Sequence, residues 1–311
     1  MKQAYATFCR QAPDVPLFLH DWYLDAVCTE GDWAAAVVEK GGKPVAVWPF
    51  FLKQKWGYRY VAMPPLCKMM GPCLLPEYRG GKHETALIEA LLAQLPPLAA
   101  FEQDCHYPFQ NWLPLYWQGF RQTTRYSYTL ENTGRLEDTW NGLTSDYRNN
   151  KIPKAREYVS LDTTDDTAFF LQVHDKSFVR KGMKPPFAPD FLLRIDRALA
   201  AHGRRRMVLA RDRQDGAVHS AAYLAWDDRS AWLLLAGDDP DKRASGAGML
   251  VIWETIRYAF EELKLPVYDF AGSMIRPVER VRRQFGAVQQ PYFRVRKEWS
   301  ALWRLGKNWW R

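Results

Sequence analysis

A glycine-rich turn between an apolar strand and an amphipathic helix constrains the fold most strongly. Residues 230–237 read SAWLLLAG, and the turn DDPDKRASGAG carries the chain on to residue 248. Apolar residues then recur at helical spacing from 249 to 263, and a second strand-like run, PVYDFAG, follows at once. A strand, a turn, a helix and another strand in this order favour an α+β unit.

The turn has two interpretations, and the residues alone leave both open. Gly246 and Gly248 have no Cβ, so a ligand could approach the backbone closely. The first N–H groups of the following helix have no internal partner and suit a phosphate, to which Arg243 could add a cation. The alternative is an ordinary helix start, because glycine is common in turns and the acids at 238, 239 and 241 would repel a phosphate.

The spacing of this turn excludes two common phosphate-binding motifs. No Gly-Lys-Ser/Thr follows, so it is not a Walker loop, and the Gly-x-Gly-x-x-Gly dinucleotide pattern is absent. The six histidines show no metal-ligand spacing such as His-Glu-x-x-His, so no metal is predicted.

The rest of the chain of 311 residues predicts two domains. A hairpin is expected around Gly41-Gly42, a helix over 83–95, and a mostly helical segment over 136–158 that is broken at Pro153. Three strands over 205–237 then precede the glycine turn. We expect an N-terminal domain over 1–140 and a C-terminal domain over 141–311, with a basic, Trp-rich tail that either lies on a membrane or packs back on the first domain.

The positive charge is concentrated near the C-terminus. Residues 276–311 contain ten Lys or Arg and two acids, an excess that equals the formal net charge of +8. Nucleic acid, anionic lipid or an anionic substrate could face this region. No run of about 18 apolar residues and no secretion signal is evident, and the five cysteines lack a disulfide pattern, so we expect a cytoplasmic protein, or one peripheral at the inner membrane face.

Several motifs resemble those of FemAB-like proteins, the double-domain relatives of methicillin-resistance factors in the GNAT acyltransferase superfamily. Arg-x-x-Gly-x-Gly at 243–248 resembles the acyl-CoA pyrophosphate loop of GNAT proteins. YDFAGSM and VRRQFGA resemble the Asp-Phe-Gly-Gly-Ser and Phe-Lys-x-x-Phe-Gly landmarks, and TWNGLTSDYRNNKIPKARE resembles a Trp-x-x-Leu…Arg-x-x-Ile-x-x-Ala element. Two departures stand out: Ala271 replaces the first Gly, and Val281-Arg282 stands in place of Phe-Lys.

The resemblance implies an α+β fold of tandem GNAT-like domains, each a mixed, largely antiparallel sheet flanked by helices. It also implies an N-acyltransferase that moves an acyl group from acyl-CoA, such as acetyl-CoA, to an amine of a cell-envelope or sugar-type acceptor. Two alternatives stay open. One is an aminoacyl-tRNA-dependent transferase acting on a peptidoglycan precursor, and the other is a non-catalytic, membrane-associated binding protein of the same fold.

The resemblance also implies where the site residues lie. The donor would bind at Arg243, Ser245, Gly246, Ala247 and Gly248, and the acceptor at Arg148, Lys151 and Arg282. Asp269, at a strand end, is the candidate acid–base group, with a turn-capping carboxylate as the alternative. Its neighbour Tyr268 could protonate the leaving thiolate, although a place in the core is the simpler interpretation.

Overall fold

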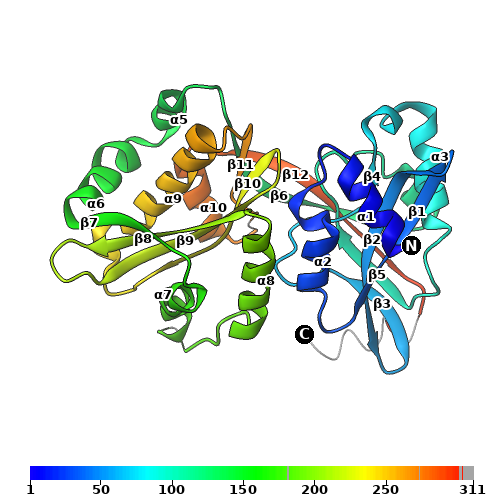
Figure 1. The fold of residues 1–311 in the computed structure, drawn as a ribbon, viewed down its shortest axis with the longest axis horizontal. Helices are drawn as coiled ribbons and strands as arrows, with labels where there is room; N and C mark the ends of the chain where they lie inside the picture. The colour runs from blue at the N-terminus through cyan, green and yellow to red at the C-terminus, as the bar shows by residue number, and fades with distance from the viewer. Residues whose placement is uncertain (181, 273, 301–302, 304–311) are drawn as a thin grey trace. The chain divides into compact units, whose positions relative to one another are not determined.

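A computed structural model describes residues 1–180, 182–272, 274–300 and 303. The chain divides into two compact units. Unit 1 comprises Met1–Arg125 together with the segment that begins at Pro291, and unit 2 comprises Tyr126–Gln290 (Figure 1). The sequence predicts one domain boundary, at 140/141. In the structure the chain passes between the units twice, at 125/126 and at 290/291.

Unit 1 is built on a mixed sheet with the strand order β1-β2-β3-β5-β12, in which only the β3–β5 pair is parallel and β4 adds to β2. Its elements are α1 (Lys2–Gln11), η1 (Leu17–Leu19), α2 (Asp21–Val27), β1 (Asp32–Lys40), β2 (Lys43–Lys55), β3 (Tyr58–Ala62), β4 (Cys73–Leu74), η2 (Pro76–Tyr78), α3 (Gly81–Leu92), β5 (Ala100–Asp104), α4 (Leu113–Trp117) and β12 (Val288–Glu298). The predicted hairpin is β1–β2, with Gly41 and Gly42 both at positive φ in the turn.

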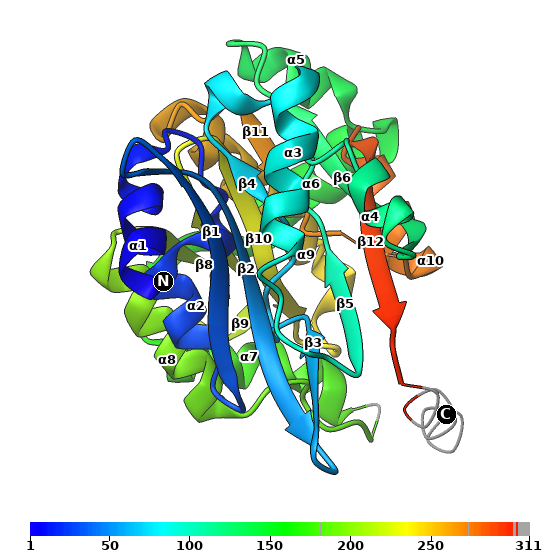
Figure 2. The ribbon, with the colours of Figure 1, turned by 90° about the vertical axis from the view of Figure 1, so that its right-hand side faces the viewer.

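Helices cover both faces of this sheet. Tyr5 of α1 packs edge-on against Trp33 of β1, with ring centroids 5.2 Å apart. Ala36 of β1 belongs instead to the core cluster that contains Leu87 and Leu91 of α3. Because Trp33 and Ala36 stand at odd and even positions of one strand, their side chains point to opposite faces, and so do the two helices. Figure 2 shows α1 and α3 on either side of β1 and β2.

Unit 2 has the strand order β6-β11-β10-β9-β8-β7, and only β10 and β11 run parallel. Its elements are β6 (Arg121–Glu131), α5 (Leu136–Gly142), the π-helix η3 (Tyr147–Lys151), α6 (Ile152–Tyr158), β7 (Val159–Thr164), α7 (Thr167–Val179), α8 (Pro189–Ala201), β8 (Arg205–Asp212), β9 (Val218–Trp226), β10 (Ser230–Asp238), η4 (Arg243–Ser245), α9 (Ala247–Arg257), the π-helix η5 (Tyr258–Glu262), β11 (Val267–Asp269) and α10 (Arg276–Gln284). β6 begins in unit 1, and β12 begins in unit 2.

The segment over 136–158 is helical as expected, but its interruption lies elsewhere. The helix ends after Gly142, and Thr144 donates its backbone N–H to the carbonyl of Gln284 at 3.0 Å. Pro153 lies just after the π-helix η3, and Lys151 and Ile152 both have right-handed helical backbone angles, so the helix continues across the proline. Proline has no N–H for the α-helical ladder, and the wider π turn lies just before it.

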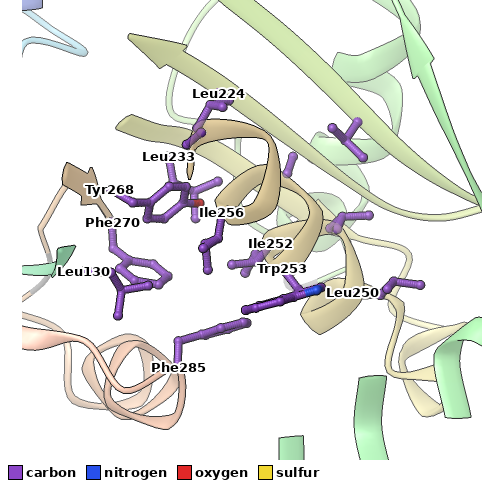
Figure 3. Packing of buried hydrophobic residues seen from close by; sticks show 14 of the residues in the cluster. Leu130, Leu224, Leu233, Leu250, Ile252, Trp253, Ile256, Tyr268, Phe270 and Phe285 are labelled. Atoms are coloured by element: carbon purple, nitrogen blue, oxygen red, sulfur yellow. The ribbon is translucent and has the colours of Figure 1, made fainter. Parts of the chain in front are cut away.

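The core of unit 2 lies between the sheet and α9. Figure 3 shows side chains of α9 packed against those of neighbouring segments, among them Leu233, Phe270 and Phe285. On the opposite face, Phe170 of α7 meets Tyr223 of β9, with ring centroids 5.6 Å apart. The predicted α+β fold with a mixed, largely antiparallel sheet flanked by helices is thus confirmed. All five cysteines are buried and free.

Candidate functional site

Gly246 forms the sharp entrance to α9. It has a left-handed conformation with φ +76°, which glycine adopts without strain. A Cβ at this position would lie 2.7 Å from the carbonyl oxygen of Lys151. The glycine is therefore required by the protein's own packing, whatever the turn binds.

Gly248 occupies the first turn of α9 and lies against a carboxylate. A Cβ here would come within 2.5 Å of Asp238 Oδ1, an oxygen that already accepts a hydrogen bond from Ser220 Oγ at 2.7 Å. Arg243 Nε lies 3.9 Å from the other oxygen of Asp238. A negative group at a helix N-terminus is favoured by the helix dipole, so Asp238 occupies a position that also attracts external anions.

A pocket of about 370 Å³ opens at this helix start, within unit 2. The five predicted donor residues all line it, and Lys151, which was predicted for the acceptor, lines it with them. Its other lining residues are Asp146, Tyr147, His219, Asp238, Lys242, Met249 and Gln284. The structure thus brings the glycine turn together with η3, which contributes a cation and a phenol.

Charges of both signs line the pocket. Lys242 Nζ lies 3.9 Å from Asp212 Oδ2 and 3.7 Å from Asp215 Oδ2, so it forms ion pairs with both carboxylates. Tyr147 is a neutral hydroxyl at physiological pH, because burial raises its pKa to about 12. The pocket therefore offers cations, a hydroxyl donor and a helix N-terminus, a combination suited to an anionic ligand.

A buried hydrogen-bonded chain supports the turn from behind. His219 Nδ1 lies 3.0 Å from Ser245 Oγ, and His219 Nε2 lies 2.9 Å from Asp212 Oδ2. Ser245 Oγ also donates to the carbonyl of Lys242 at 2.8 Å. The backbone N–H of Gln214, together with the His219 ring, holds the pKa of Asp212 below its ordinary value.

At the level of the sequence the six histidines are considered only as metal ligands, so this hydrogen-bonded chain is not predicted from them. The only sequence signal is the position of His219 on a strand next to the one that ends at Asp212. Pairing of β8 with β9 brings Arg211 opposite Val218, and so places the adjacent residues near each other. A pairing register of this kind cannot be obtained from the spacing of the residues alone.

β10 and β11 separate just before the pocket. Among the described residues, their parallel pairing ends at Trp232 opposite Asp269. On its other side, β10 has a register shift between Leu233 and Leu235 in its pairing with β9. A bulge of this kind re-aims backbone groups, and the separation frees one edge of β10 from ladder hydrogen bonds. β10 therefore has an edge without ladder pairing to β11 just before the glycine turn.

Asp269 is fully buried and its contacts organise a turn. Its Oδ1 accepts from Ser127 Oγ at 2.6 Å and from the backbone N–H of Ala271 at 2.7 Å. Ser127 Oγ in turn accepts from the N–H of Gly272 at 2.6 Å. Ala271 has φ +57°, so the carboxylate stabilises a left-handed residue where the related motif has glycine. This geometry favours the turn-capping alternative, and a chemical role for Asp269 stays a prediction.

Tyr268 is a core residue. Its hydroxyl lies 2.8 Å from Thr255 Oγ1, and burial raises its pKa well above the ordinary value. Its ring packs edge-on against Phe270, within the cluster shown in Figure 3. The interpretation as a core tyrosine fits these contacts, and protonation of a leaving group stays a prediction.

Two of the predicted acceptor residues do not line the pocket. Arg148 donates from Nη1 to the carbonyl of Asn141 at 2.8 Å, and so ties η3 to the end of α5. Arg282 stacks over the Phe270 ring, 5.0 Å from its centroid, and burial lowers the pKa of its guanidinium. Both contacts are within unit 2.

The described ranges contain neither a candidate metal site nor a membrane-spanning helix. No cluster of three or more His, Cys, Asp or Glu side chains there could hold a metal ion. No helix in the same part of the chain combines the length and the apolar character that crossing a bilayer requires.

Comparison with known proteins now adds to this geometry. Residues 146–276 match the family of the acetyltransferase (GNAT) domain. No curated protein sequence matches the chain. Among solved structures, FemX matches with a TM-score of 0.72 at 13% identity, over 94% of this chain and 95% of its own.

Two further solved structures have the same fold over nearly the whole chain. A tandem GNAT protein from the clavulanic acid biosynthesis pathway matches with a TM-score of 0.56 at 14% identity, over 96% of this chain and 93% of its own. L-PGS from Bacillus licheniformis matches with a TM-score of 0.60 at 10% identity, over 98% of this chain and 94% of its own. The resemblance to FemAB-like proteins is confirmed at the level of the fold, and the chain contains an acetyltransferase domain of the GNAT superfamily, as expected for an acyltransferase.

Proposed function

We propose that the protein transfers an acyl group from acyl-CoA to an amine, with the donor held by the pocket at the start of α9. One observation carries this proposal: the pocket lies where α9 begins, at the end of β10 and beyond the point where β10 has parted from β11. Lys151 and Arg243 offer cations to a diphosphate, and the first N–H groups of α9 offer hydrogen bonds. The acetyltransferase domain matched over 146–276 supports the same donor.

The reaction needs few groups from the protein. A neutral amine attacks the thioester carbonyl, a C–N bond forms, the C–S bond breaks, the amine loses a proton and the thiolate gains one. Backbone N–H groups on the unpaired edge of β10, beyond Trp232, would stabilise the developing oxyanion. Asp269 stays the proposed acid–base group, with Tyr268 as the proposed proton donor to the thiolate, and the mutation argued in the Discussion tests the carboxylate.

For the acceptor we propose an amine of a cell-envelope or sugar-type compound. The support is fold similarity to proteins whose names refer to such chemistry. One is a C-terminal domain attributed to a lysylphosphatidylglycerol synthetase of Agrobacterium fabrum, with a TM-score of 0.55 at 13% identity. A cytoplasmic protein, in part peripheral at the membrane, would have access to envelope precursors.

Calorimetry with acetyl-CoA tests the donor. We expect the wild type to bind, and Lys151→Ser to weaken binding about five- to tenfold by removing one charge contact. Lys154→Ser is the matched control, because Lys154 lies three residues further along, is exposed, and does not line the pocket. Absence of heat with the wild type, or equal loss in both variants, would contradict the proposal.

A second candidate function is transfer from aminoacyl-tRNA. α10 carries Arg276, Arg280 and Arg283 as exposed side chains, a cationic surface suited to a phosphate backbone. If tRNA rather than acetyl-CoA binds, and its affinity falls steeply with salt, this donor replaces acyl-CoA. Binding of neither, with the fold intact, favours the non-catalytic alternative.

A further inference from the structure

An exposed tryptophan forms the tip of the β2–β3 hairpin in unit 1. Trp56 is 61% exposed and has φ +52°, and Gly57 follows with φ +79°. Two-residue hairpins with two positive φ values favour Asn-Gly or Asp-Gly, because a bulky side chain is strained in the left-handed region. The fold itself would be better served by asparagine at this position, so the choice of tryptophan calls for another explanation.

A lysine contacts the ring of this tryptophan, and two more cations are close to it in the sequence. Lys55 Nζ lies 4.5 Å from the centroid of the Trp56 ring. The segment 53–60 reads KQKWGYRY, with three cations, three aromatic residues and no acid. Lys53 is paired with Glu30 at 3.1 Å, whereas Arg59 is exposed. Figure 2 shows this hairpin turn extending beyond the ends of the neighbouring strands of unit 1.

The end of β12 brings a further lysine and a further tryptophan to the end of the sheet at which β3 begins. β5 runs parallel to β3 and antiparallel to β12, so the start of β3 and the end of β12 lie at one end of the sheet. Ala99 connects them, because its N–H donates to the carbonyl of Arg59 at 2.8 Å and its carbonyl accepts from the N–H of Trp299 at 2.9 Å. Trp299 is 45% exposed, and Lys297 Nζ lies 4.7 Å from its ring centroid.

We call this surface the basic aromatic edge and define it by Lys55, Trp56, Tyr58, Arg59, Lys297 and Trp299. Next to it is a recess of about 860 Å³ with Pro96, Pro97, Leu98 and Phe120 among its lining residues, and with Lys297 and Trp299 at its wall. Trp303 also belongs to this end of unit 1, since its ring packs on Tyr60 at 4.6 Å. Most of the basic, Trp-rich tail, for which a membrane and the first domain were both considered, comprises residues 301–302 and 304–311 and lies outside the described residues.

We propose that the basic aromatic edge docks onto an anionic lipid surface. Trp and Tyr rings prefer the interface between headgroups and acyl chains, and Lys and Arg near them are attracted to anionic headgroups. Lysine is depleted in the cores of protein–protein interfaces, so a protein partner fits this edge less well. The ammonium groups of Lys55 and Lys297 lie over the two tryptophan rings, so each ring carries a positive charge beside it that anionic headgroups attract. This inference does not depend on the acyl donor.

Co-sedimentation with vesicles tests it, using phosphatidylcholine alone and an equal mixture of phosphatidylcholine and phosphatidylglycerol. The full-length wild type should bind the mixed vesicles, and added salt should weaken the binding while leaving a residual part due to the rings. Trp56→Asn is the decisive variant. Asparagine suits the left-handed turn, so the melting temperature should stay equal or rise, while vesicle partitioning should fall about five- to tenfold.

Tyr158→Asn is the matched control. Tyr158 is an aromatic residue of unit 2, is 51% exposed and has Lys154 Nζ 5.9 Å from its ring centroid, so it reproduces a Lys–aromatic pair elsewhere on the surface. Its partitioning should equal that of the wild type. The proposal is overturned if the wild type does not bind the mixed vesicles, or if Trp56→Asn binds as well as the wild type. It is also overturned if the edge binds RNA and not vesicles.

Discussion

The ring of His219 lies 3.0 Å from the hydroxyl oxygen of Ser245, and this contact ties β9 to the turn that precedes α9. Ser245 Oγ also donates to the carbonyl of Lys242 and accepts from the backbone N–H of Ala247. The other ring nitrogen of His219 lies 2.9 Å from Asp212 Oδ2, and a carboxylate oxygen accepts. The imidazole therefore bridges the Asp212 carboxylate and the Ser245 hydroxyl behind the start of α9.

We therefore expect His219→Phe to weaken acetyl-CoA binding about tenfold, because Ser245 loses the ring nitrogen that holds its hydroxyl group in place and Asp212 loses its buried hydrogen-bond partner. Calorimetry measures the affinity. Ser245→Ala completes a double-mutant cycle, in which the two effects should not add. His202→Phe, at the exposed end of α8, is the control. Additive effects, or an unchanged affinity of His219→Phe, would show that the pair does not act on the donor.

Gly246→Ala should destabilise the protein through two separate effects. A residue with a Cβ is strained at φ +76°, and that Cβ would lie 2.7 Å from the carbonyl oxygen of Lys151. Gly203→Ala isolates the first effect, because Gly203 has φ +62° and no atom within 4 Å of its Cβ position. By urea unfolding we expect about 1 kcal/mol for Gly203→Ala and about 2–4 kcal/mol for Gly246→Ala. Equal losses would mean that Lys151 moves aside freely.

Asp269→Asn separates a structural role from a chemical one. Asparagine keeps an oxygen for Ser127 and Ala271 but loses the charge, so stability should fall by about 1–2 kcal/mol. If turn capping is its whole role, the rate constant at saturating substrate should stay within about twofold of the wild type. A fall of about 100-fold with unchanged donor affinity would instead assign Asp269 to proton transfer.

His106 should make unit 1 sensitive to acid. Burial lowers its pKa from 6.5 to about 4, and Nδ1 is a buried atom with no partner among the described residues. The folded state therefore binds this proton less readily than the unfolded state does. The stabilisation is complete above pH 6.5 and is lost as the pH falls towards 4.

Between pH 7 and pH 5 we expect His106 to account for a loss of about 2 kcal/mol in unfolding free energy. His106→Gln tests this, because an amide N–H can still donate to the Pro72 carbonyl but does not titrate. Urea unfolding at both pH values should show a smaller loss in the variant than in the wild type. Equal losses would assign the acid sensitivity to other groups.

Local patterns predicted much of the fold. The apolar stripe over 249–263 corresponds to α9, which continues as the π-helix η5, and the strand over 230–237 corresponds to β10. Both predictions depend on periodicity within about 15 residues, which a sequence displays directly. The turn between them was also placed correctly, and the five residues predicted to bind the acyl donor line one pocket.

The roles of single residues depended on contacts that periodicity cannot show. Ser127 and Asp269 are 142 positions apart, yet their hydrogen bond decides that the carboxylate faces a turn. Gly246 was interpreted as a place for a ligand to approach, and its backbone neighbour is in fact Lys151. Strand pairing and helix packing create such contacts, so a sequence motif could indicate the site but not the direction of each side chain.

The two passages of the chain between the units have a consequence for biosynthesis. Residues 1–125 emerge first from the ribosome, but β12 emerges only after all of unit 2. Until then β5 is paired with β3 on one edge and lacks β12 on the other, and Asp104 lacks the guanidinium of Arg294, which reaches it at 2.6 and 2.8 Å. The half of the protein that is synthesised first is therefore completed last, and its open strand edge is the point at which a nascent chain is most exposed to wrong pairing.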